Sequence, residues 1–112
     1  MRTFHHFGIP TDQVKQNATY QEAAGLHLTD MEQSPNRIEW LRFEPDSPMP
    51  DMLKHIPHIA YEVEDLAAEL EGSQVLMEPF SPREGLTVAF VIEEGAPIEL
   101  MQFAEGAKQG VQ

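Results

Sequence analysis

The 112-residue sequence has no cysteine, few basic residues and no long apolar run. Without cysteine, the chain cannot form disulfides, thiolate metal sites or a cysteine nucleophile. No apolar run approaches the roughly 20 residues that span a bilayer. Lysine and arginine number 7 against 19 acidic residues, which gives a formal charge of −12. A surface this acidic repels nucleic acid and anionic membranes, so we expect neither as a partner.

The composition predicts one soluble domain. Hydrophobic residues make up 41% of the chain, enough to bury a core without a disulfide or a structural metal. The first residues lack the apolar stretch of a signal peptide. Together with the lack of cysteine, this predicts a cytoplasmic protein.

The order of patterns along the chain predicts an α+β fold. Runs of apolar and β-branched residues predict strands at 3–9, 26–32, 37–43, 58–63, 75–78, 86–92 and 98–103. Capping residues and apolar spacing predict helices at 13–24 and 66–71. The proline-rich segment 45–57 predicts a linker, and the small, polar tail 104–112 is expected to fray.

The second half of the chain resembles the first, which indicates two repeated modules at about 3–44 and 57–103. A histidine opens each half, at His6 and His58, and a strand with the pattern Ile-Glu-apolar-apolar-x-Phe follows later in it. These strands carry Glu39 and Glu99. A duplicated unit usually produces such self-similarity, and each half is too small to bury its own apolar face.

The repeated residues form a candidate metal site of His6, Glu39, His58 and Glu99. Each glutamate shares its strand face with apolar residues, which is unusual for a solvated carboxylate and natural at the floor of a pocket. Two imidazoles and two carboxylates suit a divalent transition ion: Zn, Ni, Co, Mn or Fe. Taken singly, each residue is more often solvated or structural than ligating. If Glu39 points elsewhere, a triad of two histidines and Glu99 remains, as in non-haem ferrous enzymes.

The sequence resembles the vicinal oxygen chelate superfamily, which includes glyoxalases, extradiol dioxygenases and bleomycin-resistance proteins. The resemblance rests on three stretches, which are His6-Phe7-Gly8-Ile9, His58-Ile59-Ala60-Tyr61-Glu62-Val63-Glu64-Asp65-Leu66 and Pro97-Ile98-Glu99-Leu100-Met101. It implies two paired βαβββ modules that form a cup-shaped, partly closed mixed sheet. It also implies that the four repeated residues bind a metal, and that a metal-bound glutamate, Glu39 or Glu99, acts as the base. The first module departs from the family pattern, because it lacks a strand or replaces it with the proline-rich segment.

The resemblance implies a small metal-dependent isomerase, epimerase or lyase whose substrate chelates the metal through two oxygens. Two alternatives stay open: a metal-free, ligand-binding or drug-sequestering module of the bleomycin-resistance type, and a ferrous dioxygenase. A homodimer is compatible with the resemblance. The candidate substrate-binding residues are Arg42, Trp40, Tyr61 and Arg83. Guanidinium groups bind anions and aromatic rings line pockets, although solvated arginines and core aromatics are the ordinary structural interpretation.

Overall fold

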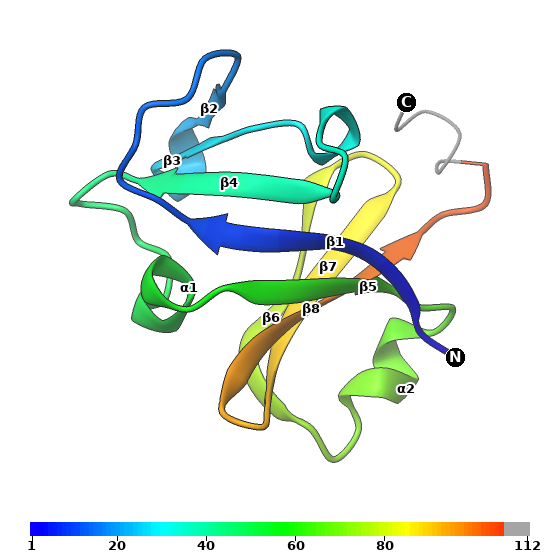
Figure 1. The fold of residues 1–112 in the computed structure, drawn as a ribbon. Helices are drawn as coiled ribbons and strands as arrows, with labels where there is room; N and C mark the ends of the chain where they lie inside the picture. The colour runs from blue at the N-terminus through cyan, green and yellow to red at the C-terminus, as the bar shows by residue number, and fades with distance from the viewer. Residues whose placement is uncertain (107–112) are drawn as a thin grey trace. The chain divides into compact units, whose positions relative to one another are not determined.

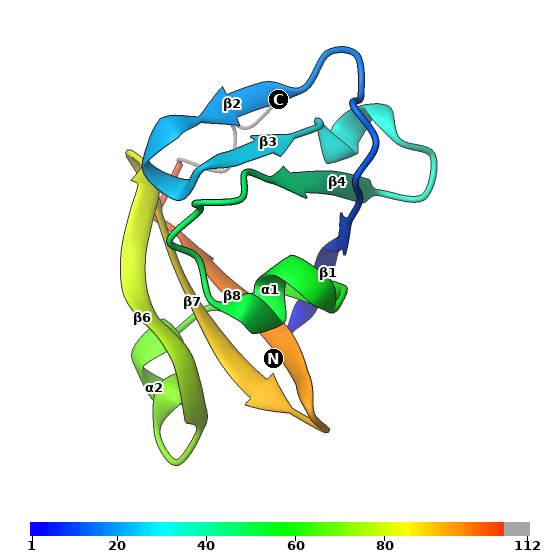
Figure 2. The same ribbon diagram turned by 90° about the vertical axis from the view of Figure 1, so that its left-hand side faces the viewer.

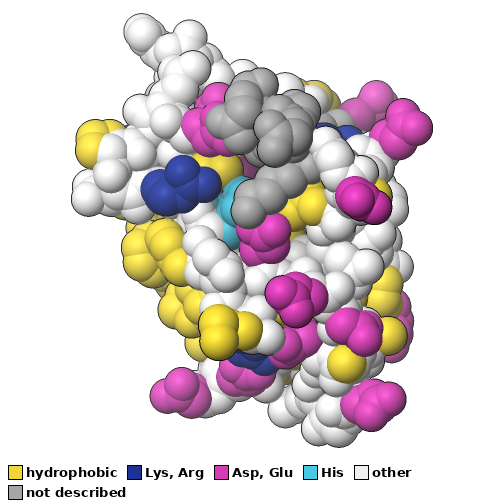
Figure 3. All heavy atoms as spheres, turned by 90° about the vertical axis from the view of Figure 1, so that its right-hand side faces the viewer, with side chains coloured by type: hydrophobic (Ala, Val, Ile, Leu, Met, Phe, Trp, Pro, Cys, Tyr) yellow, Lys and Arg dark blue, Asp and Glu magenta, His cyan; other side chains and the backbone are white. Residues whose placement is uncertain are grey.

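The structure, a computed structural model, describes residues 1–106 and has an α+β fold rich in strands. The chain divides into two compact units. The first unit comprises His6–His58, and the second comprises Met1–His5 together with the chain from Ile59 onward. The strands pair in both parallel and antiparallel directions and the helices are short. This confirms the predicted α+β class. Acidic side chains are scattered over the face shown in Figure 3, as expected from the charge of −12.

In the first unit, four strands lie in the order β2-β3-β4-β1 (Figure 1). They are β1 (Thr3–Pro10), β2 (Thr19–Gln21), β3 (Leu26–Leu28) and β4 (Ile38–Phe43), and the first three residues of β1 belong to the second unit. β1 runs parallel to β4, with Gly8 opposite Glu39 and Pro10 opposite Leu41. The other two pairings are antiparallel. Strand β1, the first in sequence, therefore lies beside the last strand of this unit's sheet.

The proline-rich segment of the first unit is packed against the rest of the unit and contains the helix α1 (Asp51–His55) (Figure 2). Leu53 of this helix is only 2% exposed. The buried Ser47 hydroxyl donates a hydrogen bond to the carbonyl of Ala24 at 2.6 Å and accepts one from the amide of Met49 at 3.2 Å. These contacts show that the segment predicted as a linker includes a structured helix.

The second unit has the element order β-α-β-β-β. Its elements are β5 (His58–Glu62, whose first residue belongs to the first unit), α2 (Leu66–Leu70), β6 (Gln74–Arg83), β7 (Leu86–Glu93) and β8 (Ala96–Phe103). The strand order is β5-β8-β7-β6, with β5 parallel to β8 and Ala60 opposite Glu99. The Asp65 carboxylate accepts a hydrogen bond from the amide of Ala68 at 3.1 Å and caps α2. The helix predicted at 66–71 is confirmed. The core of this unit contains Val63, Leu66, Ala89, Val91, Ile98 and Leu100.

An arginine near the N-terminus ties three elements of the second unit together. The Arg2 guanidinium donates hydrogen bonds to Glu69 of α2 at 3.0 Å and to Glu93 at the end of β7 at 2.8 Å. It also lies 5.6 Å from the centroid of the Tyr61 ring. The hydrogen bonds from Arg2 lower the pKa of Glu93 below its usual value.

The helix predicted at 13–24 is wrong. This segment contains the short strand β2, followed by a 3₁₀ turn at Glu22–Ala24. Val14 is 79% exposed, so the largest side chain of the expected apolar stripe is not buried, and Asn17 has a left-handed φ of 68° that interrupts a helix. The first half of the chain was expected to lack a strand or to replace it with the proline-rich segment; it contains the short strand β2.

The expected fraying of the tail 104–112 is not tested from residue 107 on, because residues 107–112 lie outside the described part of the chain. Among residues 1–106, no helix is long and apolar enough to cross a membrane.

Candidate metal centre

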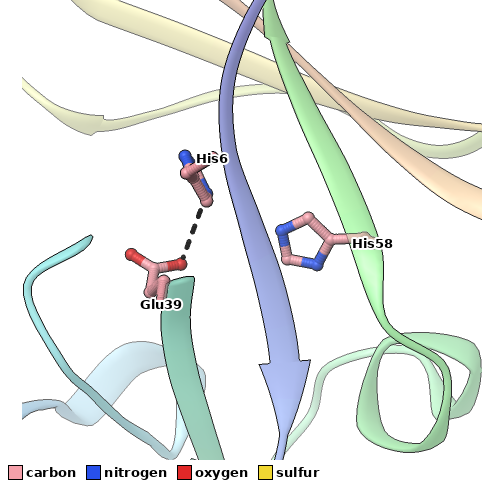
Figure 4. Close-up of side chains that lie close together, drawn as sticks. All are labelled: His6, Glu39 and His58. Carbon is pink, nitrogen blue, oxygen red and sulfur yellow. Dashed lines mark ion pairs between the residues drawn. The ribbon is translucent and has the colours of Figure 1, made fainter. Parts of the chain in front are cut away.

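Three of the four predicted metal ligands lie together in the first unit. His6 lies on β1, Glu39 on β4 and His58 at the start of β5 (Figure 4). One potential ligand atom from each residue lies within 4.8 Å of the others. These residues come from widely separated positions in the sequence, and strand pairing brings the first two together.

The strand register explains why His6 and Glu39 meet. Gly8 is the partner of Glu39 in the parallel β1–β4 pairing. Alternate residues of a strand share one face, so His6, two residues before Gly8, lies on the same face as Gly8. The Nε2 atom of His6 lies 3.5 Å from Oε1 of Glu39. The parallel pairing thus holds one imidazole and one carboxylate side by side.

The ring of His58 packs directly against the backbone of Gly8. A Cβ atom added to Gly8 would lie 2.1 Å from Cε1 of His58 and 2.5 Å from its Nε2 atom. The imidazoles of His6 and His58 are edge to face, with centroids 5.9 Å apart and an interplanar angle of 75°. The His58 imidazole therefore fills the space that a side chain at position 8 would occupy.

The environment of the group suits ligands for a cation. His6 and His58 are each 4% exposed, and the Glu39 side chain is 21% exposed. Two imidazoles and a carboxylate are the donors that divalent transition ions take in proteins. Three protein ligands leave coordination positions for water or substrate. The group could therefore hold a metal ion.

The fourth predicted ligand, Glu99, lies on β8 of the second unit, opposite Ala60. It is not a member of the three-residue group found within residues 1–106. Its role as a ligand stays a prediction from the sequence.

The predicted substrate-binding residues lie elsewhere. Trp40 and Arg42 alternate with Glu39 on β4 and so lie on its opposite face. The ammonium of Lys15 lies 4.6 Å from the centroid of the Trp40 ring, and Arg42 lies 3.6 Å from the Glu44 carboxylate. Tyr61 and Arg83 belong to the second unit, where they contact Arg2 and Phe103 respectively. The role of these four residues with substrate stays a prediction.

Sequence reasoning missed a cavity of about 610 Å³ in the first unit. Its lining includes Pro10, Asp12, Leu41, Phe43, Asp51, Lys54 and His55. Several of these residues belong to α1, which was not predicted because the surrounding prolines indicated a linker. Asp51 at the first position of that helix, directly after Pro50, was the available signal, because acidic residues favour a helix N-terminus.

Comparison with known proteins supports the fold. A crystal structure of the hypothetical protein BH1468 from Bacillus halodurans C-125 matches with a TM-score of 0.70 and 20% identity. The match covers 95% of this chain and 97% of that one. No protein-family model and no curated protein matches the chain. At this identity the likeness concerns the fold alone.

Proposed function

We propose that the protein is a small metal-dependent enzyme of the vicinal oxygen chelate type. Its substrate is a small molecule that binds the metal through two oxygens, and the reaction is an isomerisation, an epimerisation or a lyase reaction. The observation that carries the proposal is the placement of ligand atoms of His6, Glu39 and His58 within 4.8 Å of one another. Both imidazoles are 4% exposed, so the two candidate histidine ligands are shielded from bulk water.

A corresponding register in the two units supports the duplicated modules that this family implies. In the first unit, Gly8 lies opposite Glu39 and His6 comes two residues before it. In the second unit, Ala60 lies opposite Glu99 and His58 comes two residues before it. The strand orders β2-β3-β4-β1 and β5-β8-β7-β6 correspond when the first is read backwards. We therefore propose that the chain consists of two βαβββ-type modules, and that the first has a segment without a helix, residues 11–18, where the second has α2.

The chemistry assigned to the residues follows from their burial. A divalent ion bound here would supply Lewis acidity toward a developing oxyanion. Glu39 is the most exposed of the three residues, so its carboxylate lies beside the two histidines and is open to solvent. In this proposal the Glu39 carboxylate takes a proton from the substrate carbon next to the chelating oxygens and later returns it. The buried imidazoles of His6 and His58 would hold the metal ion and shield it from water.

Metal binding tests the proposal directly. We expect stoichiometric cobalt or zinc binding by calorimetry and by metal analysis of the wild-type protein, and a large loss in His58→Ala. His27→Ala is the matched control, because His27 lies on β3 and pairs with Glu44 at 2.6 Å instead. Wild-type protein that binds no divalent ion would overturn the proposal and leave the metal-free binding module.

The same geometry favours a second candidate, a ferrous dioxygenase. Two histidines and one carboxylate with open coordination positions are typical of non-haem iron oxygenases. The carboxylate placed with the histidines is Glu39, whereas the sequence alone pointed to Glu99 for this triad. Oxygen consumption by iron-loaded protein in the presence of a catechol would favour the oxygenase. Exchange of a substrate C–H proton with deuterated solvent, without oxygen uptake, would favour the isomerase or lyase.

A further inference from the structure

The cavity in the first unit begins beside the candidate metal centre, on the same face of the sheet. Along β1 and β4, the pair Pro10–Leu41 follows the pair Gly8–Glu39. Two residues advance a strand by about 6.6 Å. Leu41 and Phe43 share the face of Glu39, and Pro10 shares the face of His6. Because Pro10, Leu41 and Phe43 line the cavity, its apolar wall continues from the ligand cluster.

The charged residues around this cavity are mostly acidic, and two of them have no partner. Glu44 is paired with His27 at 2.6 Å and lies 3.6 Å from Arg42. The carboxylates of Asp12 and Asp51 make no hydrogen bond or ion pair with any residue in 1–106.

One lysine, Lys54, also lines the cavity. The Lys54 ammonium donates a hydrogen bond to the backbone carbonyl of Ser47 at 2.7 Å and keeps its positive charge. The lining nevertheless has three carboxylates, those of Asp12, Glu44 and Asp51, against this one ammonium, so a negative charge remains for a ligand.

We infer that this cavity receives the part of the substrate that extends beyond its chelating oxygens, and that it selects a tail with an ammonium group over one with a carboxylate. The inference rests on the proposed function, since the metal anchors the other end of the ligand. The apolar wall of Leu41 and Phe43 accommodates a short hydrocarbon or aromatic spacer. Asp12 and Asp51 attract a cation and repel an anion at the far end.

Three catechols with the same chelating oxygens test the inference. Dopamine carries an ammonium tail, 4-methylcatechol is uncharged, and 3,4-dihydroxyphenylacetate carries a carboxylate. Each is titrated under nitrogen at neutral pH into cobalt-loaded protein, and the visible spectrum of the cobalt reports binding. We expect dopamine to bind up to about tenfold more tightly than 3,4-dihydroxyphenylacetate, with 4-methylcatechol between them, because two exposed ion pairs contribute at most about this much. The ratio should fall as salt is added.

Charge-neutral variants connect the preference to the cavity. In the double variant Asp12→Asn, Asp51→Asn, we expect the ratio of the two affinities to fall to about one while cobalt binding is unchanged. Both positions are exposed, so the variant should fold. Asp30→Asn is the matched control. It removes one negative charge from the same unit, outside this cavity, and so is compared with each of the two single variants as well as with the double variant; asparagine also caps the 3₁₀ turn that follows Asp30.

The outcomes separate this inference from the proposed function. Equal affinities for all three catechols, or a ratio that survives in the double variant, would overturn the inference and leave the metal-dependent function standing. Failure of the protein to bind cobalt, or of cobalt-loaded protein to bind any catechol, would overturn the proposed function and the inference with it.

Discussion

Replacing Gly8 with alanine should displace the His58 ring and weaken metal binding. The added Cβ would lie 2.1 Å from Cε1 of His58, and 2.5 and 2.7 Å from its two nitrogens. Carbon atoms in contact lie about 3.5 Å apart or more, so the ring must move by at least about 1.4 Å. Metal–ligand distances tolerate only about 0.2 Å. We therefore expect the affinity for zinc or cobalt to fall by about 10- to 100-fold, the effect typical of a mispositioned ligand.

Calorimetric titration of the metal-free protein with zinc measures this change, and thermal unfolding shows whether the variant folds. Overpacking at Gly8 should cost about 1–3 kcal/mol of stability. Gly72→Ala is the matched control: it introduces a side chain at a φ of 73° with no atom within 4 Å. Gly72→Ala should lower stability and leave metal affinity unchanged.

A double-mutant cycle with His58→Ala isolates the mechanism. If Gly8→Ala acts through the His58 ring, the double variant should bind metal no more weakly than His58→Ala alone. A folded Gly8→Ala protein with wild-type affinity would refute the placement of His58 against β1. Additive losses in the double variant would show that Gly8 acts through another residue.

Three further predictions concern the ligand set, the ion pairs and the core. Glu39→Gln should lower metal affinity by more than about tenfold, because an amide is a poorer ligand for a cation, whereas Glu44→Gln should not; calorimetry distinguishes them. Glu93→Gln should lower the free energy of unfolding by about 0.5 kcal/mol at pH 7, a modest value because the side chain is 39% exposed. Arg2 lowers the pKa of Glu93, so the stability difference between wild type and Glu93→Gln should be complete above the usual glutamate pKa and should disappear as the pH falls through the folded-state pKa. Thermal unfolding measured from pH 7 to pH 3 tests this, and a stability difference that stays constant over the range would contradict it. Leu53→Ala should cost about 2–5 kcal/mol in urea unfolding, because Leu53 is 2% exposed, and a loss below 1 kcal/mol would mean that α1 is not packed.

Local patterns were most informative where residue type suits the element. The strand carrying Glu39 and the short helix after Asp65 were both predicted close to their observed bounds. The strand is rich in apolar and aromatic residues that suit a pleated surface, Leu66 and Leu70 lie one helical turn apart, and Asp65 is a strong N-cap. The helix expected at 13–24 is wrong because its apolar stripe is thin. Val14 is 79% exposed and none of its alanines is buried, so little apolar surface is available to hold a helix against the unit.

The sequence by itself determined the α+β class, the acidic surface and the repeated histidines and glutamates, because these depend on composition, on strand periodicity and on self-similarity. Only the tertiary structure decided which of those residues meet. The parallel register of β1 with β4 sets Gly8 opposite Glu39, and the absence of a side chain at Gly8 leaves room for the ring of His58. Packing of α1 onto its unit likewise created the cavity beside them. Register and packing are long-range properties, since each is set by the free energy of burying surfaces that are distant in sequence.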